Sequence, residues 1–175
     1  MAQLFGHPES IPKSHYKGVG EIVARWAMLE HHIERLLWKA LNLDNKKGRL
    51  LTHSLGTRAK IQMLKTITLR WIASPKEQKE VRAIAKAADR LANRRHAIAH
   101  GIWGHPLGKP TQIHLFYMRE GHQRILPQVE RIKASDLARV ATAVRALDQR
   151  IIAATKGLTV AGSSPPLTQS AVPPA

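Results

Sequence analysis

The stretch SPKEQKEVRAIAKAADRLANRRHAIAHGIW, residues 74–103, decides the fold expected for this chain. Ser74 can accept from exposed amides, Pro75 suits the first helical position, and Glu77 can complete a capping box. Apolar residues then recur at alternating spacings of three and four, which is the buried stripe of an amphipathic helix. The members of this stripe are Val81, Ile84, Ala88, Leu91, Ile98 and Ile102. The stretch therefore predicts a helix from about residue 75 to about residue 101.

Three other segments show the same spacing. The first runs from about 17 to 43, where polar and glycine residues break it, and its stripe is Ile22, Trp26, Leu29, Ile33, Leu36 and Leu37. The second covers about 57–72 with Ile61, Leu64, Thr68, Trp71 and Ile72. The last opens at Ser135 and Asp136 and carries Leu137, Val140, Val144, Leu147 and Ile151. Four amphipathic helices with matching stripes predict an all-α fold, an up-and-down four-helix bundle.

An insert separates the last two helices. Glycine and proline at 104, 106, 108 and 110 prevent regular helix. Residues 111–119 and 123–132 then read as two short strands around a turn at Gly121. We therefore expect a short β-hairpin or an irregular insert before the last helix.

The composition predicts one domain with two irregular ends. The chain has 175 residues and 43% apolar content, enough for a single core. We expect an irregular N-terminal arm at 1–16, the helical bundle at 17–157, and a disordered Pro/Ser-rich tail at 158–175 that carries no charged residue. The absence of cysteine excludes a disulfide framework and thiolate zinc sites. With neither a secretory signal nor a membrane-spanning stretch in view, we expect a cytoplasmic protein without a membrane partner.

The charge of the chain points to a polyanionic partner. Lys and Arg number 28 against 12 acidic residues, which gives a formal charge of +16. Each phosphate that a protein neutralises releases counterions, so nucleic acid is the first candidate. An anionic membrane surface is the rival. The basic residues are spread over every helix instead of being gathered on one amphipathic segment, which favours nucleic acid.

Arg95 is the most informative single residue. It lies on the apolar stripe between Leu91 and Ile98, where a guanidinium needs an acidic or phosphate partner. One interpretation is a buried ion pair that holds helices together, and the other is a phosphate-facing role. Glu30, at the edge of the first stripe, is the expected partner under either interpretation.

Two histidines follow Arg95 at the end of the same helix. His100 precedes Gly101, where the helix dipole favours imidazolium, so it is a candidate proton donor or acceptor, or alternatively a C-terminal cap. His96 lies one turn away, a spacing that also suits zinc, but neither a metalloprotease glutamate nor a cysteine accompanies it, so we expect no metal. Arg95 and His100 lie about 140° apart around a regular helix. Either the helix end deforms or two chains cooperate, and we therefore expect a homodimer with these helices near its axis.

A basic flank runs along the same helix toward the histidines. Its members occupy a sector of about 120°. They are Lys79, Arg82, Lys86, Arg90 and Arg94. A run of this kind is either a solvated face or a set of contacts to RNA backbone phosphates.

The run around Arg95 resembles the signature of the HEPN family (higher eukaryotes and prokaryotes nucleotide-binding): arginine, a polar residue, a short spacer and histidine. Arg95, His96 and His100 fill these places, with histidine where asparagine is commoner. The resemblance includes Ala99–Trp103 and the segment Trp26–Glu30, and it covers roughly residues 17–156.

The resemblance implies small helical bundles, usually dimers, many of which are metal-independent endoribonucleases that use arginine and histidine in one cleft. It implies an RNA 2′-hydroxyl transesterification at Arg95, His100 and His96, in a toxin or phage-defence setting with an antitoxin partner. Other members are non-catalytic and bind RNA, nucleotide or protein, and this is the alternative function. No Walker loop or dinucleotide fingerprint is present, so we expect no cofactor.

Overall fold

The computed structural model of the chain describes residues 11–106, 109, 111–120 and 125–160. Within these residues the fold is mostly helical, with one three-stranded antiparallel sheet. The elements in order are α1 (Lys13–Ala40), α2 (Asn45–Thr52), α3 (Thr57–Trp71), α4 (Pro75–His100), β1 (Ile102–Gly104), β2 (His114–Glu120), β3 (Ile125–Arg131) and α5 (Ala134–Gly157). The expected all-α fold with a short β insert before the last helix is confirmed. None of the described helices has an apolar stretch long enough to cross a bilayer.

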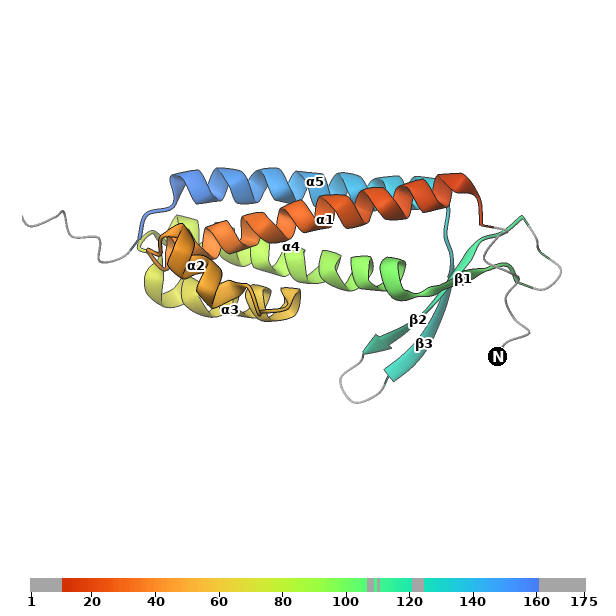
Figure 1. Cartoon of the computed structure of the whole chain (residues 1–175), viewed down its shortest axis with the longest axis horizontal. Coiled ribbons are helices and arrows are strands. Elements are labelled where there is room, and N and C mark those ends of the chain that lie inside the picture. The colour runs from red at the N-terminus through yellow and green to blue at the C-terminus, as the bar shows by residue number, and fades with distance from the viewer. Residues whose placement is uncertain (1–10, 107–108, 110, 121–124, 161–175) are drawn as a thin grey trace, which may run out of the picture.

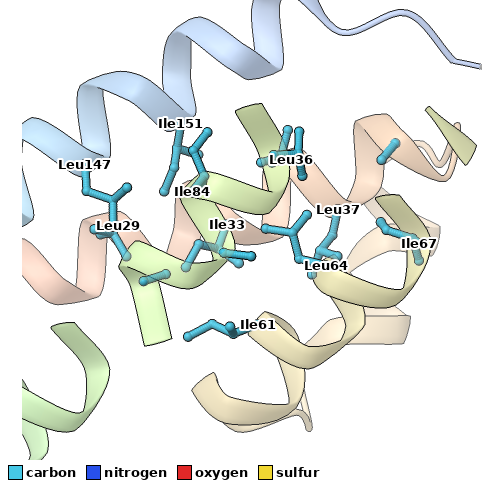
Figure 2. Packing of buried hydrophobic residues seen from close by; sticks show 14 of the residues in the cluster. Leu29, Ile33, Leu36, Leu37, Ile61, Leu64, Ile67, Ile84, Leu147 and Ile151 are labelled. Atoms are coloured by element: carbon cyan, nitrogen blue, oxygen red, sulfur yellow. The ribbon is translucent and has the colours of Figure 1, made fainter. Parts of the chain in front are cut away.

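The four long helices share one hydrophobic core. α1 and α5 lie side by side along the molecule, and α3 packs against α1 and α4 (Figure 1). Side chains from the expected stripes of all four helices meet in the core (Figure 2), among them Leu29, Ile33, Leu36, Ile61, Leu64, Ile84, Leu147 and Ile151. Full burial of an aliphatic side chain contributes roughly 1.5–3 kcal/mol, so this core stabilises the bundle. Trp71 and Ile102 are exceptions among the stripe residues, because both side chains are exposed and Ile102 lies in β1 beyond the end of α4.

The first helix begins earlier than expected. α1 starts at Lys13, and His15 is buried, with its Nε2 donating to the carbonyl oxygen of Ile132 at 3.2 Å. The boundary of the irregular arm at residue 16 is therefore wrong, because residues 13–16 are helical. Residues 1–10 of the expected arm lie outside the described residues.

A short helix follows the expected break after α1. Asn42 adopts φ 53°, a left-handed conformation that asparagine tolerates, and it ends the run as expected. Asp44 then caps α2 by accepting from two backbone N–H groups at 2.9 Å. Gly48 lies directly against the indole of Trp38, where any Cβ atom would overlap the ring. Gly48, one of the residues expected to break the helix, therefore allows α2 to pack on α1.

The sheet has the order β1-β2-β3, with all neighbours antiparallel. The β2–β3 hairpin was expected, whereas β1 was not, and the expected turn at Gly121 lies outside the described residues. Ile102, Phe116 and Val129 are partners in one row across the three strands. Among the described residues, β3 has a neighbouring strand on one side only, and it contains Pro127. The hairpin projects away from the bundle (Figure 1).

A second hydrophobic cluster joins the sheet to the bundle. It contains Ile22 of α1, Ile98 of α4, Leu115 of β2 and Leu137 of α5, all completely buried. Because these side chains interlock at the C-terminal end of α4, the sheet is held against that end of the helix.

The cap of α4 differs from expectation in one partner. Ser74 Oγ accepts from the N–H of Glu77 at 3.5 Å, as expected. The Glu77 carboxylate does not close a capping box: it accepts from the N–H and hydroxyl of Thr159 at 2.9 and 3.1 Å. Leu158 is buried, so the first residues of the expected disordered tail belong to the fold. Residues 161–175 of that tail lie outside the described residues.

Candidate functional site

The candidate site lies where α4 ends and the sheet begins. Gly101 is extended and turns the chain from α4 into β1. A Cβ atom on Gly101 would lie 2.5 Å from the carbonyl oxygen of Ala97 and 2.9 Å from that of Phe116. Only glycine therefore allows β2 to approach the helix end this closely, and this approach places His100 beside the sheet.

Trp103 fixes the same turn from the opposite face of β1. Its Nε1 donates to the carbonyl oxygen of Ile98 at 3.0 Å. Its ring packs edge-to-face on His15, with 6.2 Å between centroids. Trp103 is therefore used for packing and for satisfying a carbonyl at the helix end.

Arg95 is half-buried, and its Nε is completely buried without a hydrogen-bond partner. Its Nη1 lies 3.5 Å from Nε2 of His100 in the same chain, at the outer limit of a hydrogen bond. The angle of about 140° around the helix therefore does not prevent a contact within one chain, and the expected homodimer stays a prediction. Among the described residues, no carboxylate forms an ion pair with Arg95.

The two histidines are both exposed at the end of α4. Their rings lie 4.7 Å apart between centroids with a tilt of 47°. A guanidinium can donate only to an unprotonated imidazole nitrogen, so the contact from Arg95 suits the neutral form of His100. Within the described part of the chain, no three histidine or acidic side chains converge in a way that would hold a metal ion.

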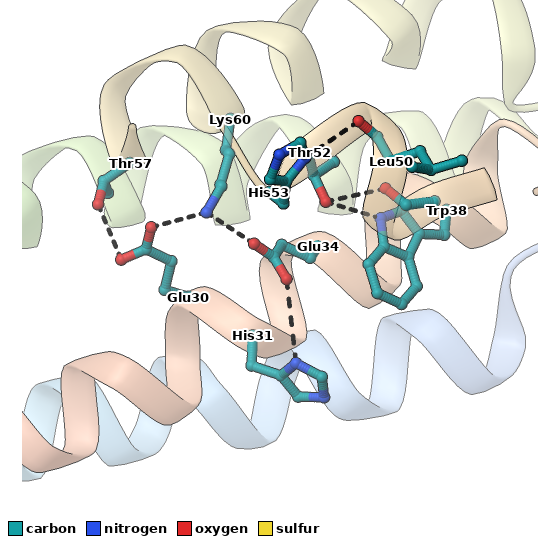
Figure 3. A network of polar contacts seen from close by, with 10 residues as sticks. Glu30, His31, Glu34, Trp38, Leu50, Thr52, His53, Thr57 and Lys60 are labelled. Atoms are coloured by element: carbon teal, nitrogen blue, oxygen red, sulfur yellow. Dashed lines mark hydrogen bonds and ion pairs between the residues drawn. The ribbon is translucent and has the colours of Figure 1, made fainter. Parts of the chain in front are cut away.

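Glu30 is not the partner of Arg95. Its carboxylate accepts from the hydroxyl of Thr57 and from the ammonium of Lys60, both at 2.9 Å (Figure 3). Lys60 also pairs with Glu34 at 2.6 Å. Burial alone would lower the pKa of Lys60, but the hydrogen bonds and charges of Glu34 and Glu30 outweigh it and raise that pKa. The predicted pairing of Glu30 with Arg95 is therefore wrong, because the start of α3 supplies a nearer cation.

A groove runs from the start of α3 to the end of α4, with a volume of about 730 Å³. Four arginines line it: Arg58, Arg90, Arg94 and Arg95. Thr57, Asn93 and His96 add hydrogen-bonding groups, and none of the described residues that line the groove is acidic. The groove, here called the arginine groove, therefore suits an anion.

The basic flank of α4 divides into two parts. Arg90 and Arg94 reach the arginine groove, whereas Lys79, Arg82 and Lys86 are exposed but do not line it. Arg94 also pairs with Glu130 of β3, so part of its charge is already neutralised. Arg58 was not foreseen, because the sequence does not reveal that the start of α3 faces the end of α4.

A second pocket of about 240 Å³ adjoins the arginine groove. His96 and His100 form one side of it, and Ile102, Phe116 and Met118 of the sheet form the other. The two hollows share His96 and Met118 as wall residues, so they lie next to each other. The sheet residues were also missed, since the sequence placed a hairpin nearby but gave no sign of where it would dock.

Comparison with models of known families, with curated proteins and with solved structures finds no match. The functional proposal below therefore depends on the residues at the end of α4 and on the resemblance of their spacing.

Proposed function

We propose that the protein is a metal-independent endoribonuclease of the HEPN type. The observation that carries the proposal is Arg95: a guanidinium with a buried, unpartnered Nε, in contact with His100, in a groove with no acid among its described lining residues. A buried polar group without a partner costs about 1–3 kcal/mol, and the guanidinium that carries this cost borders a groove where it can bind an anion such as an RNA phosphate.

The proposed reaction is an internal transesterification. The ribose 2′-oxygen forms a bond to the adjacent phosphorus, the bond from phosphorus to the 5′-oxygen breaks, and a 2′,3′-cyclic phosphate remains. His100 accepts the 2′-hydroxyl proton, and His96 supplies a proton to the leaving 5′-oxygen. Arg95 donates to the non-bridging oxygens as their charge increases. No metal or cofactor takes part in this scheme.

The proposal includes partners that follow from the resemblance. The enzyme acts in the cytoplasm as a homodimer with α4 near the two-fold axis, and in a toxin or phage-defence setting an antitoxin protein holds it silent. Each chain brings its own Arg95 and His100 together, and the homodimer is proposed from the resemblance.

A non-catalytic module that binds RNA, nucleotide or a protein is the second candidate. One observation favours it: among the described residues, no carboxylate or carbonyl orients the ring of His96 or His100 by a hydrogen bond. Catalytic histidines are commonly held by such a group. In this candidate function the arginine groove binds the partner, and no bond is cleaved.

The test is cleavage of RNA by purified protein in the presence of chelator. Wild type is compared with Arg95→Ala and His100→Ala, and with Arg82→Ala as a matched control on α4 outside the groove. We expect cleavage by wild type and Arg82→Ala, products that end in 2′,3′-cyclic phosphate by mass spectrometry, and a loss of about 100-fold or more in the other two variants. Cleavage that survives both site substitutions would reject this site, and RNA binding without cleavage by wild type would favour the binding module.

A further inference from the structure

Arg94 carries a carboxylate partner at the arginine groove. Its Nη1 donates to Oε1 of Glu130 in β3, and both side chains are half-buried. Arg94 lines the groove, whereas Glu130 is not among the lining residues. An anion that approaches Arg94 therefore meets a guanidinium whose charge is partly neutralised, with a carboxylate directly behind it.

The register of the sheet determines where this carboxylate lies. Glu130 is the direct partner of Leu115 in β2, and directly opposed residues of antiparallel strands have their side chains on the same face. Leu115 is completely buried in the second hydrophobic cluster, so this face is turned toward the bundle. Tyr117, two residues along β2 and on the same face, lines the arginine groove. The strand pairing therefore presents Glu130 to α4 beside the groove.

The neighbouring arginines on α4 have no such counter-ion. Arg95 contacts His100, and Arg90 is exposed one turn before Arg94. Among the described residues, neither Arg90 nor Arg95 forms an ion pair with a carboxylate. One phosphate can thus bind at Arg95 without disturbing Glu130, but an anion that also reaches Arg94 has to compete with Glu130 for it.

We infer that Glu130 is an intramolecular competitor of RNA at Arg94, and that it holds the affinity of the arginine groove below its full value. Two negative charges at one guanidinium repel each other, so a phosphate gains Arg94 only when the carboxylate is displaced. The inference rests on the proposed function only in that RNA phosphates occupy the groove, because it requires no cleavage.

The experiment is a double-mutant cycle in binding. The probe is a fluorescent single-stranded 2′-O-methyl oligonucleotide, whose blocked 2′-oxygen prevents transesterification. Fluorescence anisotropy gives its affinity for wild type, Glu130→Gln, Arg94→Met and the double variant at several salt concentrations. Glu130→Thr, whose side chain suits a strand, is a second test of the same position.

Glu80→Gln is the matched control. It removes the same charge from another ion pair, the exposed one between Glu80 and Arg150. Glu80 lies on α4 about 21 Å from Arg94 along the helix axis. This distance exceeds the range over which exposed charges interact at physiological salt. A gain that depends only on net charge would therefore appear in this control as well.

We expect Glu130→Gln and Glu130→Thr to bind the probe about 3-fold more tightly than wild type, as is usual for the loss of a partly exposed ion pair. The slope of log affinity against log salt should steepen by about 0.7, because Arg94 then neutralises a phosphate. Both changes should disappear in the Arg94→Met background, and Glu80→Gln should show neither.

Unchanged affinity in both Glu130 variants, or an equal gain in Glu80→Gln or in the Arg94→Met background, would overturn the inference. Weaker binding by both Glu130 variants would also overturn it, because Glu130 would then position Arg94 for the ligand. Cleavage of natural RNA tests the proposed function separately. Tighter binding by Glu130→Gln without cleavage by wild type would reject the endoribonuclease and support the inference, and cleavage without that gain would do the reverse.

Discussion

Arg95 destabilises the fold locally and is also placed where it could bind a ligand. Its Nε is buried without a partner, although Arg94, its neighbour, has an ion pair with Glu130. Proteins commonly tolerate such local destabilisation where a ligand completes the set of contacts. The two adjacent arginines therefore offer a direct comparison.

Replacing Arg95 by methionine should leave the fold intact or make it more stable. Arg95→Met removes an unsatisfied buried donor and keeps apolar volume, so the free energy of unfolding should stay constant or rise by up to about 1 kcal/mol while RNA cleavage is lost. Arg94→Met breaks a half-exposed ion pair and should lower that free energy by about 0.5–1 kcal/mol. Urea denaturation measures both. A loss of more than about 2 kcal/mol in Arg95→Met would mean that Arg95 is a structural residue.

His114 should make stability depend on pH. Burial lowers the pKa of His114 below its ordinary value of 6.5, and the charges of Arg131 and Lys109 lower it further. The unfolded chain therefore binds a proton first as the pH falls. The contribution of His114 to stability is complete above pH 6.5 and is lost as the pH falls from there through the lowered pKa.

The measurement is the thermal midpoint of wild type and His114→Gln across pH 5–8. The midpoint of wild type should fall relative to that of the variant below about pH 6.5. A difference between the two proteins that is constant with pH would contradict the lowered pKa.

The sequence identified Arg95, His96 and His100 because they are close together in the chain and their spacing carries a signature. The sequence did not predict the partner of Glu30, the place of Arg58 in the arginine groove, or the sheet residues that line the second pocket. Their roles depend on which helix faces which, and a stripe of apolar residues defines the buried side of a helix without naming its neighbour. For this reason the sequence did not show that Glu30 forms its ion pair with Lys60 and not with Arg95.

The helices followed their apolar spacing closely, because a long amphipathic stripe leaves few alternatives to burial. α3 and α4 were expected to within a residue or two of their observed bounds. α2 and β1 were missed because they are short: α2 has eight residues and β1 has three. Elements of this length form because they pack on partners distant in the sequence, so local patterns do not reveal them.

The packing of α1 on α5 requires a glycine at position 18 but not at position 20. A Cβ atom on Gly18 would lie 2.8 Å from Cβ of Leu137, whereas a Cβ on Gly20 would meet nothing within 4 Å. Gly18→Ala should therefore reduce the free energy of unfolding by about 1–3 kcal/mol through overpacking. Gly20→Ala should raise it by about 0.5–1 kcal/mol, because alanine favours helix. Chemical denaturation of the two variants checks this, and changes of the same sign would contradict the packing of α1 on α5.

The chain has a formal charge of +16, but only some of its basic residues border the candidate site. If RNA binds through the arginine groove, affinity should fall with salt, and each phosphate contact on a single strand contributes about −0.7 to the slope of log affinity against log salt. Arg90→Ala, in the groove, should make that slope shallower by about 0.7. Lys79→Ala, on the same helix but outside the groove, should leave it unchanged.

Fluorescence anisotropy between low and physiological salt provides these slopes. Equal effects of the two substitutions would show that RNA is held by the general charge of the protein instead of by the groove. That result would also weaken the case for chemistry at Arg95, because a loosely held backbone does not position one phosphate for attack.

Pro127 has a consequence for self-association of this hairpin. Within the described part of the chain β3 is paired on one side only, with β2, and its other edge would otherwise offer a row of backbone N–H and C=O groups to an extended peptide. Proline has no N–H to give, and it sits opposite Met118 near the middle of the ladder. The apolar face of the sheet can therefore stay exposed to a ligand, while the edge strand resists the strand-to-strand pairing that leads to fibrils.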